Sequence, residues 1–434
     1  MKRFLYSILI LMIAASGCSR TDGDSRATIT YQTIETLPQQ RALLSQLIRK
    51  FEQQNPGIRV KVITSPNGFQ KLHAQYAAGN VPDVFYYVSD RLFGFVRKKG
   101  IADLKPLIDG DPSVDLAKFF PETVDACRLD GGIYLMPVHF STDVLFYNKD
   151  IFDKYGVPYP DENWTWADFL SAAQRLTVKE DIITTQYGTL QPRPVLVMKS
   201  FGAEFFDEGL TRPLFGGDGA RESIAYLKTL SDREIVPSQA QIRDVEVMDG
   251  VSLFSTGKVA MLLGRTYMLV EFGSIKTFDW DVTLVPKGAR RSSRLAVGGN
   301  CIYAGTKHPK EAWELVKFFS SEEALRTAGA SRNCVPAMIS VARSDVFMHE
   351  PPKHVAVFVD AIRDSAMENP RMEYWFEYVD KVIQLDVEKV IYNQMTVDGA
   401  VADIARNGED ILRKERREIE KWKANRDPKQ GEMP

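Results

Sequence analysis

The stretch AQYAAGNVPDVFYYVSD, residues 74–90, joins the end of a helix to the start of a buried strand. Gly79 ends the helical pattern, and DVFYYVS is short and rich in aromatic and β-branched side chains, as strands are. Upstream lie a strand at residues 58–64, a helix whose apolar residues recur at helical spacing up to Phe51, and a strand at residues 27–34. This order of elements predicts an α/β fold with a parallel sheet and right-handed crossovers.

The alternation of strands and helices continues in the second half of the chain. Thr165 and Asp168 have the spacing of a capping box at the start of a helix at residues 166–176. A helix at residues 307–319 carries its apolar side chains on one face. A chain body of about 410 residues with two such runs predicts two domains. Further elements are expected at residues 220–232 (helix), 259–264 and 280–285 (strands), and from residue 355 onward (mostly helical).

The N-terminus has the features of a bacterial signal peptide. Positive residues precede an apolar run that is about half the ~20 residues needed to cross a bilayer. Residues 15–18, Ala-Ser-Gly-Cys, resemble the lipobox that is cleaved before an acylated cysteine in bacterial lipoproteins. We therefore expect residues 1–17 to be removed and residues 18–26 to form a lipidated Cys18 and its tether. The anchor would hold the protein on a membrane of the cell envelope, facing the periplasm or the cell exterior. The alternative is an ordinary secretory signal in which the cysteine has no role.

Charge and histidine spacing exclude several classes of function. A net charge of −2 with 26% charged residues gives no sign of a nucleic-acid-binding surface. The charge-dense stretch LRKERREIEKWK, residues 412–423, mixes acids and bases and predicts a solvated helix face. The five histidines show no zinc-like spacing with cysteines or carboxylates. We expect no metal, no cofactor and no nucleic-acid partner.

The stretch PVHFSTDVLFYNKDIF, residues 137–152, holds the side-chain types of a hydrolase triad in His139, Ser141 and Asp143. In an extended strand they lie on one face about 6.6 Å apart with serine in the middle, so Asp143 cannot orient the His139 ring. No Gly-x-Ser-x-Gly motif occurs elsewhere, and we predict no catalytic residue. Two interpretations remain: a buried strand whose polar groups satisfy neighbouring backbone, or a hinge strand that presents polar atoms to a ligand.

Four segments carry a family resemblance: AQYAAGNVPDVFYYVSD, GGIYLMPVHFSTDVLFYNKDIFDKYGV, FSTGKVAMLLGRTY and AVGGNCIYAGTKHPKEAWELVKFFSSEEA. Their order and spacing resemble the extracellular solute-binding proteins of ABC importers, in the maltose-binding-like, sugar-binding group. The resemblance implies a two-lobed periplasmic-binding-protein type II fold, with each lobe a mostly parallel sheet flanked by helices and a ligand cleft between the lobes. It implies that lobe one comprises residues 27–138 and 296–333, and lobe two residues 139–295 and 334–434.

A sugar presents hydroxyl groups and an apolar ring face, so its site needs hydrogen-bonding groups and an aromatic platform. Gln32, Glu35 and Asp90, near strand ends, are candidate hydroxyl contacts or else loop residues that cap helices. Tyr267 and Trp375 are candidate platforms or else core residues. The resemblance also implies that the chain crosses between the lobes near residues 137–142, 296–300 and 332–336. These crossover segments add candidate ligand contacts at His139, Phe140, Ser141, Gly298, Gly299, Asn300 and Arg332.

Arg265 is a further candidate contact, and Gly298 and Gly299 have a structural alternative. The glycines Gly298 and Gly299 allow close backbone approach, or alternatively form a bulge. Arg265 stands where members of the group often have small residues, and we expect it to meet an anionic group such as a uronate.

Three cysteines remain once Cys18 is assigned to the anchor: Cys127, Cys301 and Cys334. A disulfide is permitted outside the cytoplasm, and we expect one between Cys301 and Cys334. The alternative is three buried free thiols.

The resemblance implies a monomeric binding protein and not an enzyme. Such a protein captures a sugar or oligosaccharide by lobe closure and delivers it to the permease subunits of an ABC importer. Two other interpretations stay open from the residues alone. One is a surface enzyme that acts on glycans with paired carboxylates, and the other is a sensor that binds ligand and signals to a membrane receptor.

Overall fold

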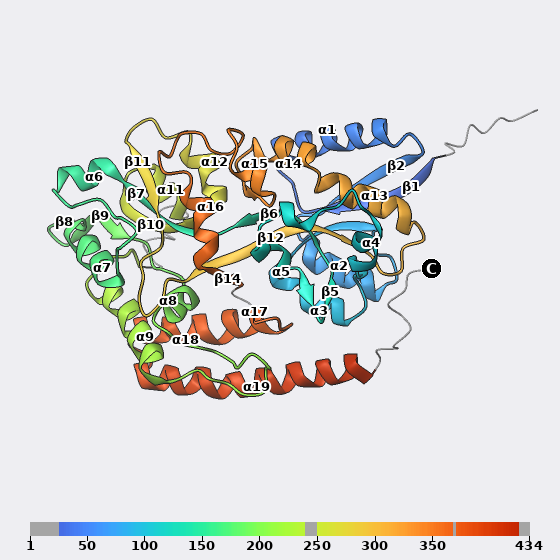
Figure 1. Ribbon diagram of the computed structural model, residues 1–434. Helices are drawn as coiled ribbons and strands as arrows, with labels where there is room; N and C mark the ends of the chain where they lie inside the picture. The colour runs from blue at the N-terminus through green and yellow to red at the C-terminus, as the bar shows by residue number, and fades with distance from the viewer. Residues whose placement is uncertain (1–25, 239–249, 368–369, 425–434) are drawn as a thin grey trace, which may run out of the picture.

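The computed structural model describes residues 26–238, 250–367 and 370–424, which form two lobes joined by long strands (Figure 1). Each lobe is built on a β-sheet flanked by helices. The first sheet has the strand order β13 (Val335–Pro336), β6 (Met136–Ser141), β12 (Ser293–Ile302), β3 (Val84–Val88), β1 (Ala27–Thr33), β2 (Ile58–Thr64), with β14 (Ser365–Met367) also paired to β12. The second sheet has the order β11 (Trp280–Thr283), β7 (Asp143–Asn148), β10 (Val259–Arg265), β9 (Ile183–Thr189), β8 (Val178–Glu180).

The sheets are mixed, and the prediction of a mostly parallel sheet in each lobe is wrong. The predicted strands β1, β2 and β3 do pair in parallel. In contrast, β12 pairs antiparallel with both β3 and β6, and β7 pairs antiparallel with both β10 and β11. The reason is that β6 and β12 connect the two lobes directly, without the crossover helix that a parallel neighbour requires.

The chain passes from the first sheet to the second sheet between Ser141 and Asp143. β6 pairs with β12 as far as Ser141, and β7 of the second sheet begins at Asp143. Val335 and Pro336 pair with β6 in the first sheet. Sheet pairing therefore extends the first lobe beyond the predicted boundaries at residues 138 and 333.

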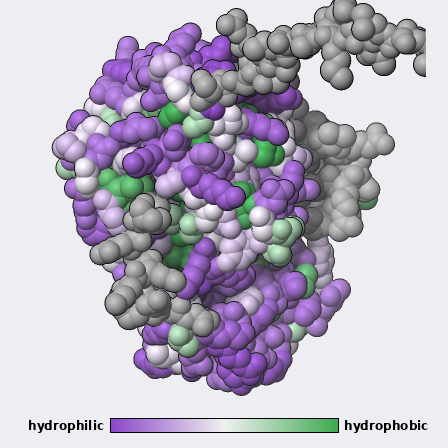
Figure 2. Space-filling model, turned by 90° about the vertical axis from the view of Figure 1, so that its right-hand side faces the viewer, coloured by the Kyte–Doolittle hydropathy of each residue, from purple (hydrophilic) through white to green (hydrophobic). Residues whose placement is uncertain are grey.

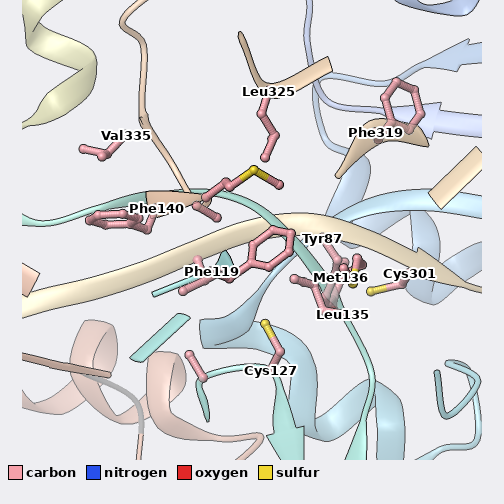
Figure 3. Packing of buried hydrophobic residues seen from close by; sticks show 14 of the residues in the cluster. Tyr87, Phe119, Cys127, Leu135, Met136, Phe140, Cys301, Phe319, Leu325 and Val335 are labelled. Atoms are coloured by element: carbon pink, nitrogen blue, oxygen red, sulfur yellow. The ribbon is translucent and has the colours of Figure 1, made fainter. Parts of the chain in front are cut away.

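Helices cover the first sheet and close its core. The apolar face predicted for α13 (Pro309–Phe319) is buried, and Phe318 and Phe319 contact Phe51 and Tyr31 with ring centroids 5.5 and 5.0 Å apart. Figure 3 shows the buried side chains around β6 and β12. The other elements of this lobe are α1 (Pro38–Gln54), α2 (Gly68–Ala77), α3 (Leu92–Arg97), α4 (Lys105–Gly110), α5 (Pro121–Asp125), α14 (Glu322–Gly329), α15 (Ile339–Ala342), and the hairpin strands β4 (Arg128–Leu129) and β5 (Gly132–Ile133).

The second lobe has its own buried cluster, which includes Phe152, Trp166 and Phe169. The capping box predicted at Thr165 and Asp168 is present, and it begins α7 (Trp166–Arg175). The other helices of this lobe are α6 (Lys149–Lys154), α8 (Pro194–Ser200), α9 (Gly217–Asp232), α11 (Gly250–Ser255), α12 (Leu269–Phe272), α16 (Val357–Asp360), α17 (Trp375–Tyr378), α18 (Gln384–Ile391) and α19 (Val397–Ala424).

The last helix, α19, connects the lobes a second time. It packs against α9 and α18 of the second lobe, and its C-terminal half runs beneath the first lobe, where it contacts α3 (Figure 1). Glu415 on α19 forms an ion pair with Arg97 of α3, and the Glu415 side chain is fully buried. The charged stretch at residues 412–423 is therefore mostly a solvated face, as predicted, with Glu415 as a buried exception.

The cysteines Cys127, Cys301 and Cys334 are free thiols, so the predicted Cys301–Cys334 disulfide is wrong. Cys301 lies on β12 and Cys334 directly precedes β13, with β6 between these strands. Strands two positions apart are separated by about 9–10 Å, whereas bridged cysteines need Cα atoms within about 7 Å. Cys18 lies outside the described residues.

The surface at the first-lobe end of the molecule is mostly hydrophilic, with small, separate apolar patches (Figure 2). Among the described residues, no helix has the length and apolarity needed to cross a membrane.

Candidate ligand-binding site

The carboxyl ends of β1, β2 and β3 meet at one edge of the first sheet, because these strands run parallel. Gln32 there donates a hydrogen bond from Nε2 to the carbonyl of Gly68 (3.3 Å), and Asp90 is buried in the turn after β3. The backbone N–H of Glu35 donates to the Thr33 hydroxyl (3.1 Å), and burial raises the pKa of the Glu35 carboxyl. Gln32 and Glu35 thus lie near the end of β1, whereas Asp90 lies five residues beyond Phe85, the residue of β3 that pairs with Gln32.

His139 of β6 and Tyr86 of β3 form a polar pair on either side of β12. The Tyr86 hydroxyl lies 3.2 Å from His139 Nε2, and the two rings stack with centroids 5.7 Å apart. Burial lowers the pKa of His139 to about 4, so the ring is neutral at physiological pH. Gly298 of β12 makes room for the pair, because a Cβ at this position would come within 2.7 Å of His139 Nε2.

The register of β12 against β6 shifts between Gly298 and Gly299. The strand pairing is therefore irregular at these glycines, and Val138 of β6 has no partner on β12. A Cβ on Gly299 would collide with the backbone carbonyl of Met136, so both glycines are needed for strand packing.

Several buried polar atoms on β1, β6 and β12 have no hydrogen-bond partner among the described residues. They are Gln32 Oε1, His139 Nδ1, Ser141 Oγ and Asn300 Oδ1. Each such atom costs about 1–3 kcal/mol when it stays unpaired, so this arrangement favours a ligand that brings hydroxyl groups.

His139 and Asn300, which carry two of these atoms, line a cavity of about 130 Å³ in the first lobe. Glu35, Tyr86, His139, Asn300 and Cys334 form the polar part of its lining. Burial and the Glu35 carboxylate raise the pKa of the Cys334 thiol to about 12, while the Arg265 charge lowers it. The cavity therefore lies within electrostatic range of an arginine from the second lobe.

An ion network lies at the junction of the lobes, centred on Asp143 at the start of β7. Asp143 accepts hydrogen bonds from Arg193 Nη2 (2.7 Å), Arg265 Nε (3.1 Å) and the backbone N–H of Arg294 (3.1 Å). Burial alone would raise the pKa of Asp143, but Arg193 and Arg265 hold it below its usual range. Arg294, on β12, also donates from Nε to Asp90 (3.0 Å).

This network connects the edge of the first sheet to the second sheet. Asp90 follows β3, Arg294 lies on the connecting strand β12, and Arg265 ends β10. Asp90 and Arg265 are thus linked through Arg294 and Asp143. The Arg294 guanidinium group pairs with Asp90, while the Arg294 backbone N–H and the Arg265 side chain both donate to Asp143.

Two predicted ligand contacts are wrong. The Phe140 side chain is fully buried and contacts Phe120, with ring centroids 5.2 Å apart. Trp375 is also fully buried, and it packs edge-on against Phe205 (5.1 Å). Both side chains belong to the core because neighbouring helices cover the strand and helix that carry them.

Tyr267 is exposed to solvent, whereas Arg332 is hydrogen-bonded to the backbone. Tyr267, directly after β10, is 47% exposed and is not a core residue, so its ring is available to a ligand. Arg332 donates from Nη1 to the carbonyl of Pro351 (2.8 Å), and the cavity is lined instead by its neighbours Ser331 and Asn333.

Three site residues were missed by sequence reasoning: Tyr86, Arg193 and Arg294. Arg294 carried a usable signal, since a charged side chain inside a buried strand requires a partner. Tyr86 is one of two adjacent tyrosines on opposite faces of β3, and Arg193 precedes a helix as many surface residues do. Within the described part of the chain, no group of His, Cys, Asp and Glu side chains is arranged to hold a metal ion.

Two known binding proteins are similar in sequence over most of this chain. A binding protein of Brucella abortus (strain 2308) is 24% identical over 422 residues, covering 93% of this chain and 97% of that protein. The arabinooligosaccharide-binding protein of Bacillus subtilis (strain 168) is 24% identical over 340 residues, covering 74% of this chain and 76% of the relative.

A solved structure also superposes on most of this chain. An ABC substrate-binding protein from Listeria monocytogenes in complex with cycloalternan superposes with a TM-score of 0.78 at 26% identity, covering 90% of this chain and 98% of that chain. The model of the family described as bacterial extracellular solute-binding protein matches residues 36–325. The chain therefore belongs to the bacterial extracellular solute-binding protein family.

Proposed function

We propose that this protein captures a saccharide at the junction of its two lobes and delivers it to the permease of an ABC importer. Ligand binding would stabilise a closed arrangement of the lobes, as a population shift toward the state that contacts the ligand on both sides. The proposal includes no catalytic step.

The observation that carries this proposal is the set of unpaired, buried polar atoms on the strands that join the lobes. His139 Nδ1, Ser141 Oγ and Asn300 Oδ1 are aligned along β6 and β12 without partners among the described residues. A saccharide supplies hydroxyl groups that both donate and accept, and the exposed Tyr267 supplies an apolar ring for its face.

The family membership and the sugars named for two similar proteins, an arabinooligosaccharide and cycloalternan, support a saccharide as the ligand. The candidate lipobox at Cys18 supports anchoring on a membrane of the cell envelope, facing the periplasm or the cell exterior, and we propose that the protein is a monomer there. Arg265 already pairs with Asp143, so we propose that it orders the site and meets the ligand only with its remaining N–H groups.

The test is a thermal-melting screen of neutral and acidic mono- and oligosaccharides, followed by calorimetry on any sugar that raises the melting temperature. A ligand at 100 times its Kd should stabilise the protein by about 2.7 kcal/mol. Tyr267→Ala should weaken that sugar's binding at least tenfold. Tyr392→Ala is the matched control, because Tyr392 is 46% exposed on the second lobe but outside the junction. A screen without any melting shift, or equal losses in both variants, would contradict the proposal.

A further inference from the structure

The cavity beside His139 has an apolar body that no hydroxyl group of a sugar can pair with. Its walls come from α1, α13 and α14, with Leu43, Leu44, Leu47, Phe319 and Leu325 among the lining residues. Leu47 and Leu325 belong to the buried core of the first lobe, and Leu44 packs against that core. A free saccharide placed here would leave hydroxyl groups unpaired, at about 1–3 kcal/mol for each group.

One end of the same cavity is polar. Asn300 is almost completely buried and belongs to this lining, and its Oδ1 atom has no hydrogen-bond partner among the described residues. His139 and Glu35 border the same end, next to the carboxyl ends of the parallel strands. The cavity is therefore amphipathic: its polar end adjoins the proposed saccharide site, and its apolar end extends beneath α1.

We propose that this cavity is a subsite for an apolar substituent of the ligand, so that the preferred ligand is a glycoside carrying an alkyl, acyl or aryl group. The sugar lies at the polar end, where one hydroxyl donates to Asn300 Oδ1. The substituent occupies the space between α1 and α14. This inference rests on the proposed saccharide binding and adds the chemical class of the ligand.

The test compares each free sugar with its aryl glycoside by calorimetry on the purified protein. Suitable pairs are maltotriose with 4-nitrophenyl α-maltotrioside, and arabinose with 4-nitrophenyl α-L-arabinofuranoside. For at least one pair, we expect the aryl glycoside to bind tenfold tighter or more, which corresponds to about 1.4 kcal/mol.

Variants of the cavity lining test whether the aryl group binds in this cavity. Ala328 lines the cavity from α14, so Ala328→Phe should remove the preference for the aryl group while leaving the affinity for the free sugar within twofold. Ala330→Phe is the matched control, since Ala330 is exposed at the end of the same helix, and it should keep the full preference. Leu44→Gln, which makes the apolar wall polar, should also remove the preference if Ala328→Phe does not fold.

The outcomes separate the two proposals. Equal affinities within every pair, or an aryl preference that persists in both cavity variants, overturn the apolar subsite and leave saccharide capture intact. Absence of binding for both members of every pair across the sugar panel overturns both. A tenfold preference that is lost in Ala328→Phe and kept in Ala330→Phe supports the subsite.

Discussion

Asp143 holds the junction of the lobes together, so Asp143→Asn should destabilise the protein more than the loss of any exposed ion pair. The substitution keeps the shape of the side chain and removes its charge. Asp143 is 4% exposed and accepts hydrogen bonds from Arg193, Arg265 and the backbone N–H of Arg294. The amide of asparagine would place a donor against one of these donors, and both guanidinium groups would lose their counter-charge.

The size of the effect follows from burial. Removing one partner of a fully buried ion pair costs about 3–5 kcal/mol. The side chains of Arg193 and Arg265 are 38% and 24% exposed, so water screens part of the loss, and we expect about 2–3 kcal/mol. The assay is urea unfolding at neutral pH, from which the free energy of unfolding is extrapolated.

A matched control is available in Asp398→Asn. Asp398 pairs with Arg221 Nε at 2.8 Å, but its side chain is 80% exposed, so its loss should cost at most about 1 kcal/mol. The double variant Asp143→Asn/Arg265→Gln should lose less free energy of unfolding than the two single variants together, because both substitutions remove the same ion pair. Equal destabilisation by Asp143→Asn and Asp398→Asn would refute the structural role of the network.

Three further predictions concern the hinge strand and α19. Burial lowers the pKa of His139 from 6.5 to about 4, so the unfolded chain is protonated first, and stability should fall by up to about 3 kcal/mol as pH drops through this window. Unfolding at a series of pH values should show a shallower loss for His139→Gln, and an identical profile would contradict the assignment. Gly298→Ala should cost about 1–3 kcal/mol by crowding His139, whereas Gly57→Ala, which meets open space, should not, and similar melting temperatures would refute this. Glu415→Gln should lower the urea midpoint by removing the counter-charge of the buried Arg97, at a cost of about 3 kcal/mol, and an unchanged midpoint would contradict that role.

The parts of the fold that depend on local signals could be predicted from the sequence. The parallel strands β1, β2 and β3 follow from the strand–helix alternation. The capping box at Thr165 and the apolar face of α13 also follow from the spacing of residues within one helix. The antiparallel pairing of β12 could not be predicted in this way, because its partners β3 and β6 lie far away in the sequence and no local pattern specifies them.

In the candidate site, too, residues with a local sequence signal could be predicted and residues that depend on distant partners could not. His139 and Asn300 were identified through the crossover segments, and both line the cavity. Phe140 and Trp375 were misassigned because a sequence does not show which face of an element its neighbours cover. Arg294 was missed because its partner Asp90 lies 204 residues away in the sequence. Charge pairing across lobes is a property of the folded chain and not of any segment.

Small-angle X-ray scattering would show directly whether the lobes close on a saccharide. The measurement compares the radius of gyration of the purified protein with and without a sugar that raises its melting temperature. The radius of gyration should fall on saturation with the sugar, and Tyr267→Ala should need at least tenfold more sugar for the same change. A sugar that binds tightly by calorimetry and leaves the scattering profile unchanged would contradict capture by lobe closure.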